Sequence, residues 1–231
     1  MKRLRPFFSY FGSKWRLAPQ YPPPLLGLPV IEPFAGSAAY SLYHHHHQIK
    51  LYDKYPIICE IWDYLINVSE DEILGLPILE FGEQIPNSIA LEAQHLIGFW
   101  VSRASTRPGK KRRSIQWVHE KSDWTEQSRS MIARQLKFIR HWTIEQSEYF
   151  DINIEESTWF IDPPYQIMGS HYVHNDIDYQ FLKNWSNSLF GQIIICENSE
   201  SNWLQNPQTL NNTRGVNRTT KEIYEHKIVN V

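Results

Sequence analysis

The sequence predicts an α/β fold with a mostly parallel sheet, an antiparallel C-terminal hairpin and a small, mainly helical insertion. Three short apolar runs predict buried strands, and each leads to an acid: Val30–Glu32, Gln48–Asp53, and Ser157–Ile161 followed by Asp162. Helical patterns follow the first two runs, which is the alternation expected of a parallel sheet. A weakly alternating tail with Gly215 as its turn candidate predicts the hairpin.

The composition limits the classes of protein to which this chain could belong. The chain has 231 residues, enough for one α/β domain, and its net charge is −2, so any nucleic-acid partner must be met by a local basic patch. Cys59 and Cys196 both lie in apolar runs and predict reduced thiols in a cytoplasmic protein. We expect no membrane partner, because the sequence has neither a signal-peptide pattern nor an apolar run of about twenty residues.

The remaining elements follow from local patterns in chain order. An aromatic cluster before Gly12-Ser13-Lys14 predicts a tight turn that leads into a short helix. Five prolines between residues 19 and 29 predict a rigid connector. Periodicity and breakers predict helices over residues 39–43, 56–66, 69–73, 89–102, 125–142 and 178–189, and strands over 142–144 and 191–196. Residues 1–67 and 141–231 therefore form one predicted domain, and residues 68–140 form the insertion.

The stretch from Glu32 through Gly36 to Ala39 predicts a nucleotide site. It is a strand, a turn of small residues and a helix, and small residues let a ligand approach the backbone closely. The three-glycine dinucleotide pattern is absent, which argues against NAD or FAD and leaves another adenosyl ligand open. Asp53 follows Glu32 by 21 residues, the spacing of an acid that binds ribose hydroxyls.

Asp162-Pro163-Pro164-Tyr165 is the strongest single motif. Two prolines bring carbonyl acceptors without N–H donors, beside a carboxylate and an aromatic ring that we expect to be exposed. Such an acceptor rim suits a planar group that carries an NH₂. The polar residues 166–176 predict a mobile loop over the site, in which His171 or His174 could cap the pocket.

Two other polar clusters have different interpretations. Residues 103–113 carry six cations and no acid, which favours a phosphate-contacting loop: Arg103, Arg107, Lys110, Lys111, Arg112 and Arg113. Arg218 and Lys221 predict a basic tip on the C-terminal hairpin. His44 to His47 are consecutive and cannot all face one ion, so they predict a solvated helix end, and no metal site is expected.

In this order the aromatic Gly-Ser-Lys turn, Glu-Pro-Phe-Ala-Gly-Ser, the later strand-end Asp and Asp-Pro-Pro-Tyr resemble a known family. It is the S-adenosylmethionine-dependent adenine-N6 DNA methyltransferases of the DNA adenine methylase type. The resemblance covers residues 7–200 and is weaker over 68–140. It implies a Rossmann-like S-adenosylmethionine methyltransferase sheet, methyl transfer to N6 of a flipped adenine at a specific site in double-stranded DNA, and a target-recognition role for residues 68–140.

The family implies roles for individual residues. Asp162, Pro163, Pro164 and Tyr165 match the catalytic tetrapeptide. The cofactor would be bound by Tyr10, Lys14, Glu32, Phe34, Gly36, Asp53, Glu148 and Asp162, with Tyr149 beside Glu148 as the aromatic near the cofactor adenine. One departure is that Ala38-Ala39 stand where family members often have a second glycine. Alanine would be strained there if the backbone needs a positive φ.

Other assignments stay open from the sequence. The same tetrapeptide chemistry could methylate DNA cytosine N4, RNA adenine or an amide, although an Asp in its first position favours adenine. A catalytically inactive nucleic-acid-binding module is an alternative of another class. We expect a monomer or weak dimer, and the sequence leaves open both the recognition site and whether a restriction endonuclease is a partner.

Overall fold

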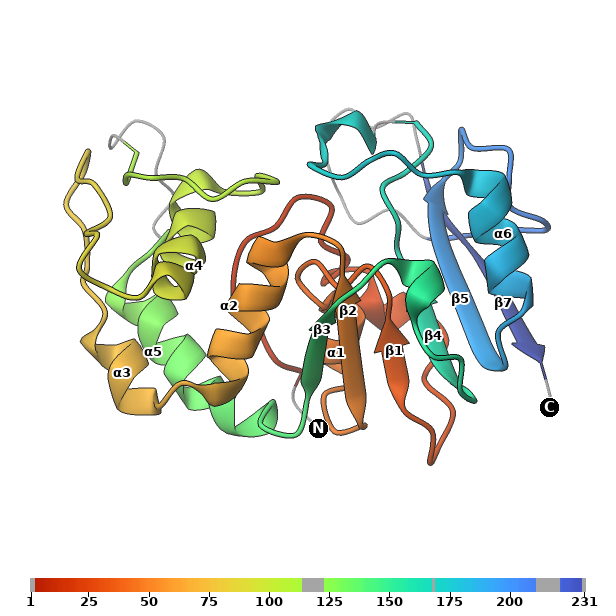
Figure 1. The fold of residues 1–231 in the computed structure, drawn as a ribbon, viewed down its shortest axis with the longest axis horizontal. Coiled ribbons are helices and arrows are strands. Elements are labelled where there is room, and N and C mark those ends of the chain that lie inside the picture. The colour runs from red at the N-terminus through yellow and green to blue at the C-terminus, as the bar shows by residue number, and fades with distance from the viewer. Residues whose placement is uncertain (1–2, 114–122, 168, 211–220, 230–231) are drawn as a thin grey trace.

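The computed structural model describes residues 3–113, 123–167, 169–210 and 221–229. Seven strands form one sheet in the order β3-β2-β1-β4-β5-β7-β6 (Figure 1). The neighbours from β3 to β5 pair in parallel, whereas β7 is antiparallel to β5 and β6. The strands are β1 (Val30–Glu32), β2 (Ile49–Asp53), β3 (Thr143–Gln146), β4 (Ser157–Ile161), β5 (Gly191–Asn198), β6 (Gln208–Thr209) and β7 (Glu222–Val229). This confirms the predicted sheet, although the expected turn at Gly215 lies outside the described residues.

Side-chain caps begin several helices where the sequence predicts them. Ser69 accepts a hydrogen bond from the Glu72 amide, and Asp178 accepts one from Phe181. The helices are α1 (Ala39–Tyr43), α2 (Pro56–Asn67), α3 (Glu70–Gly75), α4 (Leu91–Ser102), α5 (Glu126–Gln135) and α6 (Tyr179–Asn187). Short 3₁₀ turns are η1 (Ala18–Gln20), η4 (Leu136–Phe138), η5 (Tyr149–Asp151) and η6 (Gly169–His171).

Three local predictions are wrong. The helix expected over 125–142 ends at Gln135 and continues as η4, because the chain must turn into β3. The residues after Lys14 form turns and η1, so no α-helix begins there. The histidine tract is not a solvated helix end. His44 and His45 are buried, and the His45 ring contacts Phe138.

The sheet carries a buried layer on each face. Along β4, Phe160 belongs to the larger apolar cluster, which also holds the side chains of α1 and α2. Trp159 and Ile161 point the other way into a second cluster with α6. Every residue of β4 is buried, as a central strand covered on both faces requires.

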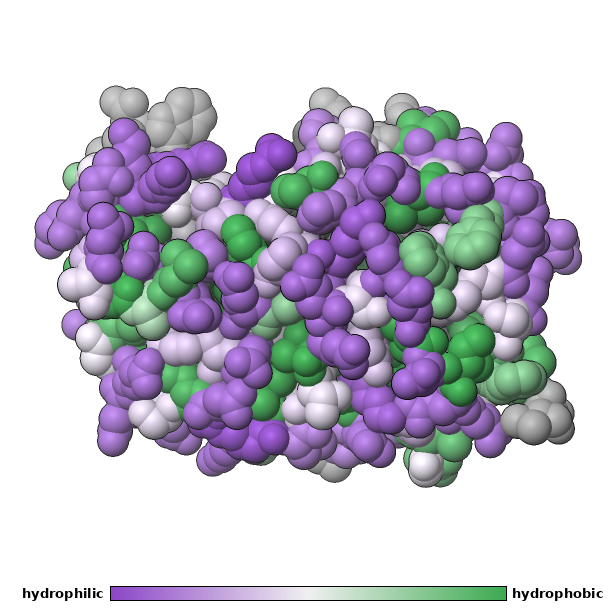
Figure 2. All heavy atoms as spheres, viewed as in Figure 1, coloured by the Kyte–Doolittle hydropathy of each residue, from purple (hydrophilic) through white to green (hydrophobic). Residues whose placement is uncertain are grey.

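Helices α3, α4 and α5 of the insertion lie at one end of the molecule, beside α2 (Figure 1). Their apolar side chains join the larger cluster, and Trp124 is fully buried within it. The upper outline is indented between this end and the rest of the molecule, and hydrophilic residues border the indentation (Figure 2). No helix within the described ranges is long and apolar enough to cross a membrane.

Candidate functional site

A cavity lies at the carboxyl ends of β1, β2 and β4. The strand order reverses between β1 and β4, which is where open α/β sheets bind ligands. All eight residues expected to bind the cofactor line this cavity: Tyr10, Lys14, Glu32, Phe34, Gly36, Asp53, Glu148 and Asp162. Segments far apart in the sequence therefore meet at one cavity.

Glu32 ends β1 with its carboxylate almost fully buried. Its Oε1 atom accepts a hydrogen bond from the Ser41 amide at 2.7 Å. Burial raises the pKa of Glu32 to about 8, although the Ser41 contacts oppose the rise. The carboxyl group is therefore largely protonated at neutral pH. A cationic group in the cavity would favour its ionised form.

The turn after β1 packs closely against the Tyr10 ring, and both line the cavity. Gly36 has a φ of +45°, and a Cβ added there would lie 3.1 Å from Cδ1 of Tyr10. Ala38 has a φ of +48°, so the backbone does need the left-handed conformation where family members often have glycine. An alanine in that conformation costs roughly 1–2 kcal/mol relative to the right-handed one. This turn is a cradle that a side chain at Gly36 would fill.

Asp53 ties the end of β2 to the same turn. Its Oδ2 accepts from the Gly36 amide at 2.9 Å, and its Oδ1 accepts from the Tyr55 amide at 2.8 Å. Burial raises the pKa of Asp53 to about 6, against the lowering effect of these two bonds. Each carboxylate oxygen has a second lone pair, so Asp53 can still accept bonds from ribose hydroxyls.

The far wall of the cavity comes from the segment after β3. Glu148 forms an ion pair with Lys54 at 2.7 Å, and Tyr149 packs against Phe34 with 5.3 Å between ring centroids. This wall therefore presents two aromatic rings and a charged pair to the cavity, which suits a planar group such as adenine. Lys54 and Tyr55 also line the cavity, although sequence reasoning did not select them. Their signal was available, since they directly follow Asp53 at a strand end.

Asp162 follows β4 and faces Lys14 across the cavity floor. Lys14 Nζ lies 3.1 Å from Asp162 Oδ1, and the two side chains are 4% and 19% exposed. Burial raises the pKa of Asp162, and the Lys14 ammonium opposes that rise. Lys14 donates its hydrogen bond to the Gly12 carbonyl at 2.8 Å, while Asp162 Oδ1 has no hydrogen-bond partner of suitable geometry within the described ranges. The Asp162 carboxylate therefore lines the cavity with its Oδ1 atom ion-paired to Lys14.

The other three residues of the tetrapeptide, Pro163 to Tyr165, are partly or fully buried against other parts of the chain. Tyr165 is half-buried rather than exposed as expected, because its hydroxyl donates to Glu222 Oε2 at 2.6 Å. The Pro164 carbonyl accepts from the Tyr179 hydroxyl at 2.8 Å. Pro163 is buried, and no donor contacts its carbonyl among the residues that the structure describes. Asp162 and Pro164 line the cavity, whereas Pro163 and Tyr165 lie just beside it.

The segment after Tyr165 passes over the cavity. Tyr172 and His174 line it, whereas His171 packs on Phe11 outside it. His174 is thus placed to cap the pocket. Tyr172 approaches Gly12 so closely that a Cβ there would lie 2.0 Å from its hydroxyl. Sequence reasoning did not select Tyr172, because nothing local distinguishes it from the other aromatics.

The basic loop after α4 reaches the same region. Thr106 Oγ1 donates to the His171 carbonyl at 2.8 Å, which joins this loop to the segment over the cavity. Five of its cations are exposed, namely Arg103, Arg107, Lys110, Lys111 and Arg113. Lys221 is exposed near the other end of the sheet, and Arg218 lies outside the described residues.

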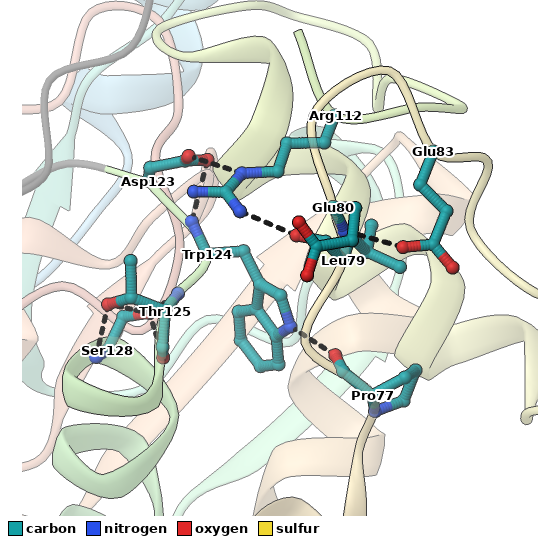
Figure 3. A network of polar contacts seen from close by, with 9 residues as sticks. All are labelled: Pro77, Leu79, Glu80, Glu83, Arg112, Asp123, Trp124, Thr125 and Ser128. Carbon is teal, nitrogen blue, oxygen red and sulfur yellow. Dashed lines mark hydrogen bonds and ion pairs between the residues drawn. The ribbon is translucent and has the colours of Figure 1, made fainter. Parts of the chain in front are cut away.

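Arg112 differs from its neighbours in the basic loop. Its Nε atom lies 2.8 Å from Asp123 Oδ2, and it also donates to the Leu79 carbonyl (Figure 3). Nearby, Trp124 donates to the Pro77 carbonyl. Arg112 therefore holds the insertion together, and its guanidinium is not free to meet a phosphate as expected. Within the described ranges no cluster of three or more potential metal ligands forms.

Comparisons with known proteins give little beyond this geometry. No family model and no curated protein matches the chain. Two solved structures of the rRNA methyltransferase aviRa from Streptomyces viridochromogenes match with a TM-score of 0.44 and 12% and 13% identity. Each match covers 96% of this chain and 87% of that one. Such distant similarity says nothing about substrate.

The fold class rests on the strands themselves. A parallel sheet ordered β3-β2-β1-β4-β5, with antiparallel β7 between β5 and β6, is the Rossmann-like methyltransferase sheet that the sequence predicts.

Proposed function

We propose that the chain transfers a methyl group from S-adenosylmethionine to N6 of a flipped adenine at a specific site in double-stranded DNA. The observation that carries the proposal is the position of Asp162. Its carboxylate lines the same cavity as Glu32 and Asp53. One cavity thus combines the features of an adenosyl site with an acceptor for an amino group.

The cavity residues fit the parts of S-adenosylmethionine. The turn at Gly36 admits a ligand against the backbone, and Asp53 keeps lone pairs for ribose hydroxyls. The buried Glu32 carboxyl can ionise beside a cationic methionine part. Phe34 and Tyr149 offer ring faces to the adenine. When bound, the cofactor supplies an electrophilic methyl group on its sulfonium.

Asp162 and Pro163 would orient the target nitrogen. Their carboxylate and carbonyl oxygens accept the two amino hydrogens, which draws N6 toward tetrahedral geometry and aims its lone pair at the methyl group. The Pro164 carbonyl accepts a hydrogen bond from the Tyr179 hydroxyl. Asp162 is also placed to take the proton that N6 loses after transfer. Burial favours its protonated form.

The target base must leave the duplex, because N6 cannot be reached inside it, and flipping costs a few kcal/mol. Stacking on the Tyr165 ring would return roughly 1–3 kcal/mol. The five exposed cations of the basic loop would contact the phosphate backbone next to the cavity. Their link to the segment over the cavity through Thr106 supports a shared DNA-facing surface.

Transfer of a tritiated methyl group tests the proposal. Unmethylated duplex DNA is incubated with labelled S-adenosylmethionine and the chain, then digested to nucleosides. We expect the label on N6-methyldeoxyadenosine with the wild type and none with Asp162→Ala. A thermal melt of Asp162→Ala controls for folding.

Each of the other possible results would indicate a different function. Label on N4-methyldeoxycytidine, or on RNA but not DNA, would overturn the adenine-DNA assignment and keep methyl transfer. Cofactor binding without transfer to any nucleic acid would favour a catalytically inactive binding module.

A further inference from the structure

Tyr165 is held by a strand that lies outside the candidate site. Its hydroxyl donates to Oε2 of Glu222 at 2.6 Å, and Glu222 begins β7, 57 residues further along the chain. The Lys14 ammonium lies 4.6 Å from the centroid of the same ring. The ring is therefore fixed at its hydroxyl end by a carboxylate and has a cation near its face. Glu222 itself does not line the cavity.

We propose that Glu222 is a positioning residue that orients the Tyr165 ring for stacking on the target base. The inference rests on the proposed function, because it assigns Tyr165 the role of the stacking platform. Glu222 does not line the cofactor cavity, and its hydrogen bond at the site goes to the Tyr165 hydroxyl. Its charge also raises the pKa of Asp162. A hydrogen bond to a carboxylate is short and roughly twice as strong as a neutral one, which suits it to fixing a ring.

The backbone around Glu222 is rigid enough for this task. Glu222 is paired with Asn198 of β5, and its carbonyl accepts from the Leu210 amide at 3.0 Å. The carboxylate is therefore presented by a strand that is bonded on both sides. Groups positioned from regular elements are held more closely than groups on loops.

The end of β5 fixes the chain immediately after the ring. Glu197 accepts from the Gln166 amide at 3.1 Å, and the Asn198 side chain donates to the Ile167 carbonyl at 2.8 Å. The main chain after Tyr165 and the hydroxyl of Tyr165 are thus both tied to the β5–β7 pair. With the backbone held by β5, the remaining freedom of the ring is limited by Glu222.

The protonation states agree with this arrangement. Burial raises the pKa of Tyr165 above its ordinary value, and the Asp162 and Glu222 carboxylates raise it further. The Tyr165 hydroxyl therefore remains a donor at neutral pH. Lys14 and the Tyr21 phenol also lie near this group.

Substitutions at Glu222 should separate target binding from cofactor binding. Glu222→Ala removes the acceptor of the Tyr165 hydroxyl. The Tyr165 ring would then become ordered only when the target base binds, which weakens binding. We expect KM for DNA to rise about 10-fold, the lower end of what a charged hydrogen bond contributes. The affinity for S-adenosylmethionine should not change. Glu222→Gln retains a neutral acceptor and should recover much of the loss.

Glu225→Ala on the same strand is the matched control. The Glu225 carboxylate accepts a hydrogen bond from the Gln205 amide and pairs with Lys183. Its replacement therefore removes carboxylate contacts from the same strand, as Glu222→Ala does, but leaves the contact to Tyr165 in place. We expect Glu225→Ala to leave KM for DNA at the wild-type value. An equal rise in both variants would overturn the proposal, as would parallel losses in DNA and cofactor binding by Glu222→Ala.

A spectroscopic measurement tests the contact without any substrate. Fluorine NMR of the full chain carrying 3-fluorotyrosine at position 165 should give a resonance displaced from that of the free amino acid. Glu222→Ala should move it toward the free value and Glu222→Gln partly so, whereas Glu225→Ala should not move it. If the wild type methylates no DNA, the proposed function fails, and this spectrum still decides whether Glu222 orients the ring. An unmoved resonance in Glu222→Ala overturns the inference.

Discussion

The buried Lys14–Asp162 pair controls the ionisation of the residue proposed to bind the target nitrogen. Lys14 opposes the rise that burial produces in the pKa of Asp162. Two charges in a dry site depend on each other, and removal of one leaves the other uncompensated. The pair is therefore expected to affect the pH dependence of the reaction rather than simple cofactor affinity.

We expect Lys14→Met to move the acid limb of the kcat profile to higher pH. Without the ammonium the pKa of Asp162 rises further, and a protonated carboxyl group is a weaker acceptor for its hydrogen bond from N6. The measurement is kcat at saturating substrates across pH, with Lys54→Met as control, because Lys54 lines the cavity but pairs with Glu148. An acid limb at the wild-type pH in Lys14→Met would contradict this role.

The raised pKa of Glu32 predicts an unusual dependence of the free energy of unfolding on pH. The pKa of Glu32 is about 8 in the folded chain against an ordinary value of 4.5, so between these two pH values the folded state holds a proton that the unfolded state has released. Stability therefore falls as pH rises from about 5 to about 8. Asp53 acts in the same direction, but its pKa of about 6 confines its effect to lower pH.

Glu32→Gln should flatten this dependence. The amide mimics the neutral carboxyl and can still accept from the Ser41 amide, so we expect the melting temperature to change little between pH 6.5 and pH 8.5, values that bracket the upper part of the Glu32 window. Thermal melts of the cofactor-free chain measure it. Asp53→Asn should keep the wild-type slope in this range. An equally steep fall in Glu32→Gln would show that another group titrates.

At the scale of elements, the turn after β1 sets how closely a ligand approaches. Gly36→Ala adds a Cβ 3.1 Å from Tyr10 and imposes a positive φ on alanine. We expect a stability loss of roughly 1–2 kcal/mol and weaker binding of S-adenosylmethionine. Urea unfolding and calorimetry measure the two effects.

Gly27→Ala provides the control for backbone strain alone. Gly27 has a φ of +81° and no atom within 4 Å of an added Cβ. It should lose similar stability and keep its cofactor affinity. Unchanged affinity in Gly36→Ala would exclude this turn from the cofactor site.

The basic loop contains two kinds of cation with different expected effects. Exposed Lys110 and Lys111, when both are replaced by Ala, should weaken DNA binding and reduce the slope of log affinity against log salt by about 2, with no change in melting temperature. Arg112→Ala instead breaks a buried ion pair with Asp123, and should cost roughly 3–5 kcal/mol of stability. Fluorescence anisotropy at several salt concentrations and thermal melts separate these effects. A salt slope at the wild-type value would contradict a phosphate-contacting role for the two lysines.

At the scale of the whole molecule, sequence reasoning was strongest where local patterns decide the structure. Apolar runs with terminal acids predicted β1, β2 and β4. The meeting of Glu32, Asp53 and Asp162 then follows, because parallel strands end at one edge of the sheet. The positive φ at Ala38 was also predictable from a local pattern, because a tight turn must join β1 to α1.

Long-range pairing was not predictable in the same way. Nothing local separates Arg112 from Lys111, because the difference is made by Asp123, which reaches it through tertiary packing. Glu222 lies far from Tyr165 in the sequence, and its role depends on β7 being inserted beside β5. His45 is buried where Phe138 contacts its ring and Trp142 donates to its carbonyl.

The central claim concerns the base that is modified, and sequencing that detects methylated bases tests it most directly. DNA is taken from cells that lack adenine methylation and express either the wild type or Asp162→Ala. The account predicts N6-methyladenine at every copy of one short sequence motif with the wild type and at none with the variant. Methylcytosine at a motif, or unmodified DNA from cells with abundant folded wild-type protein, would contradict it.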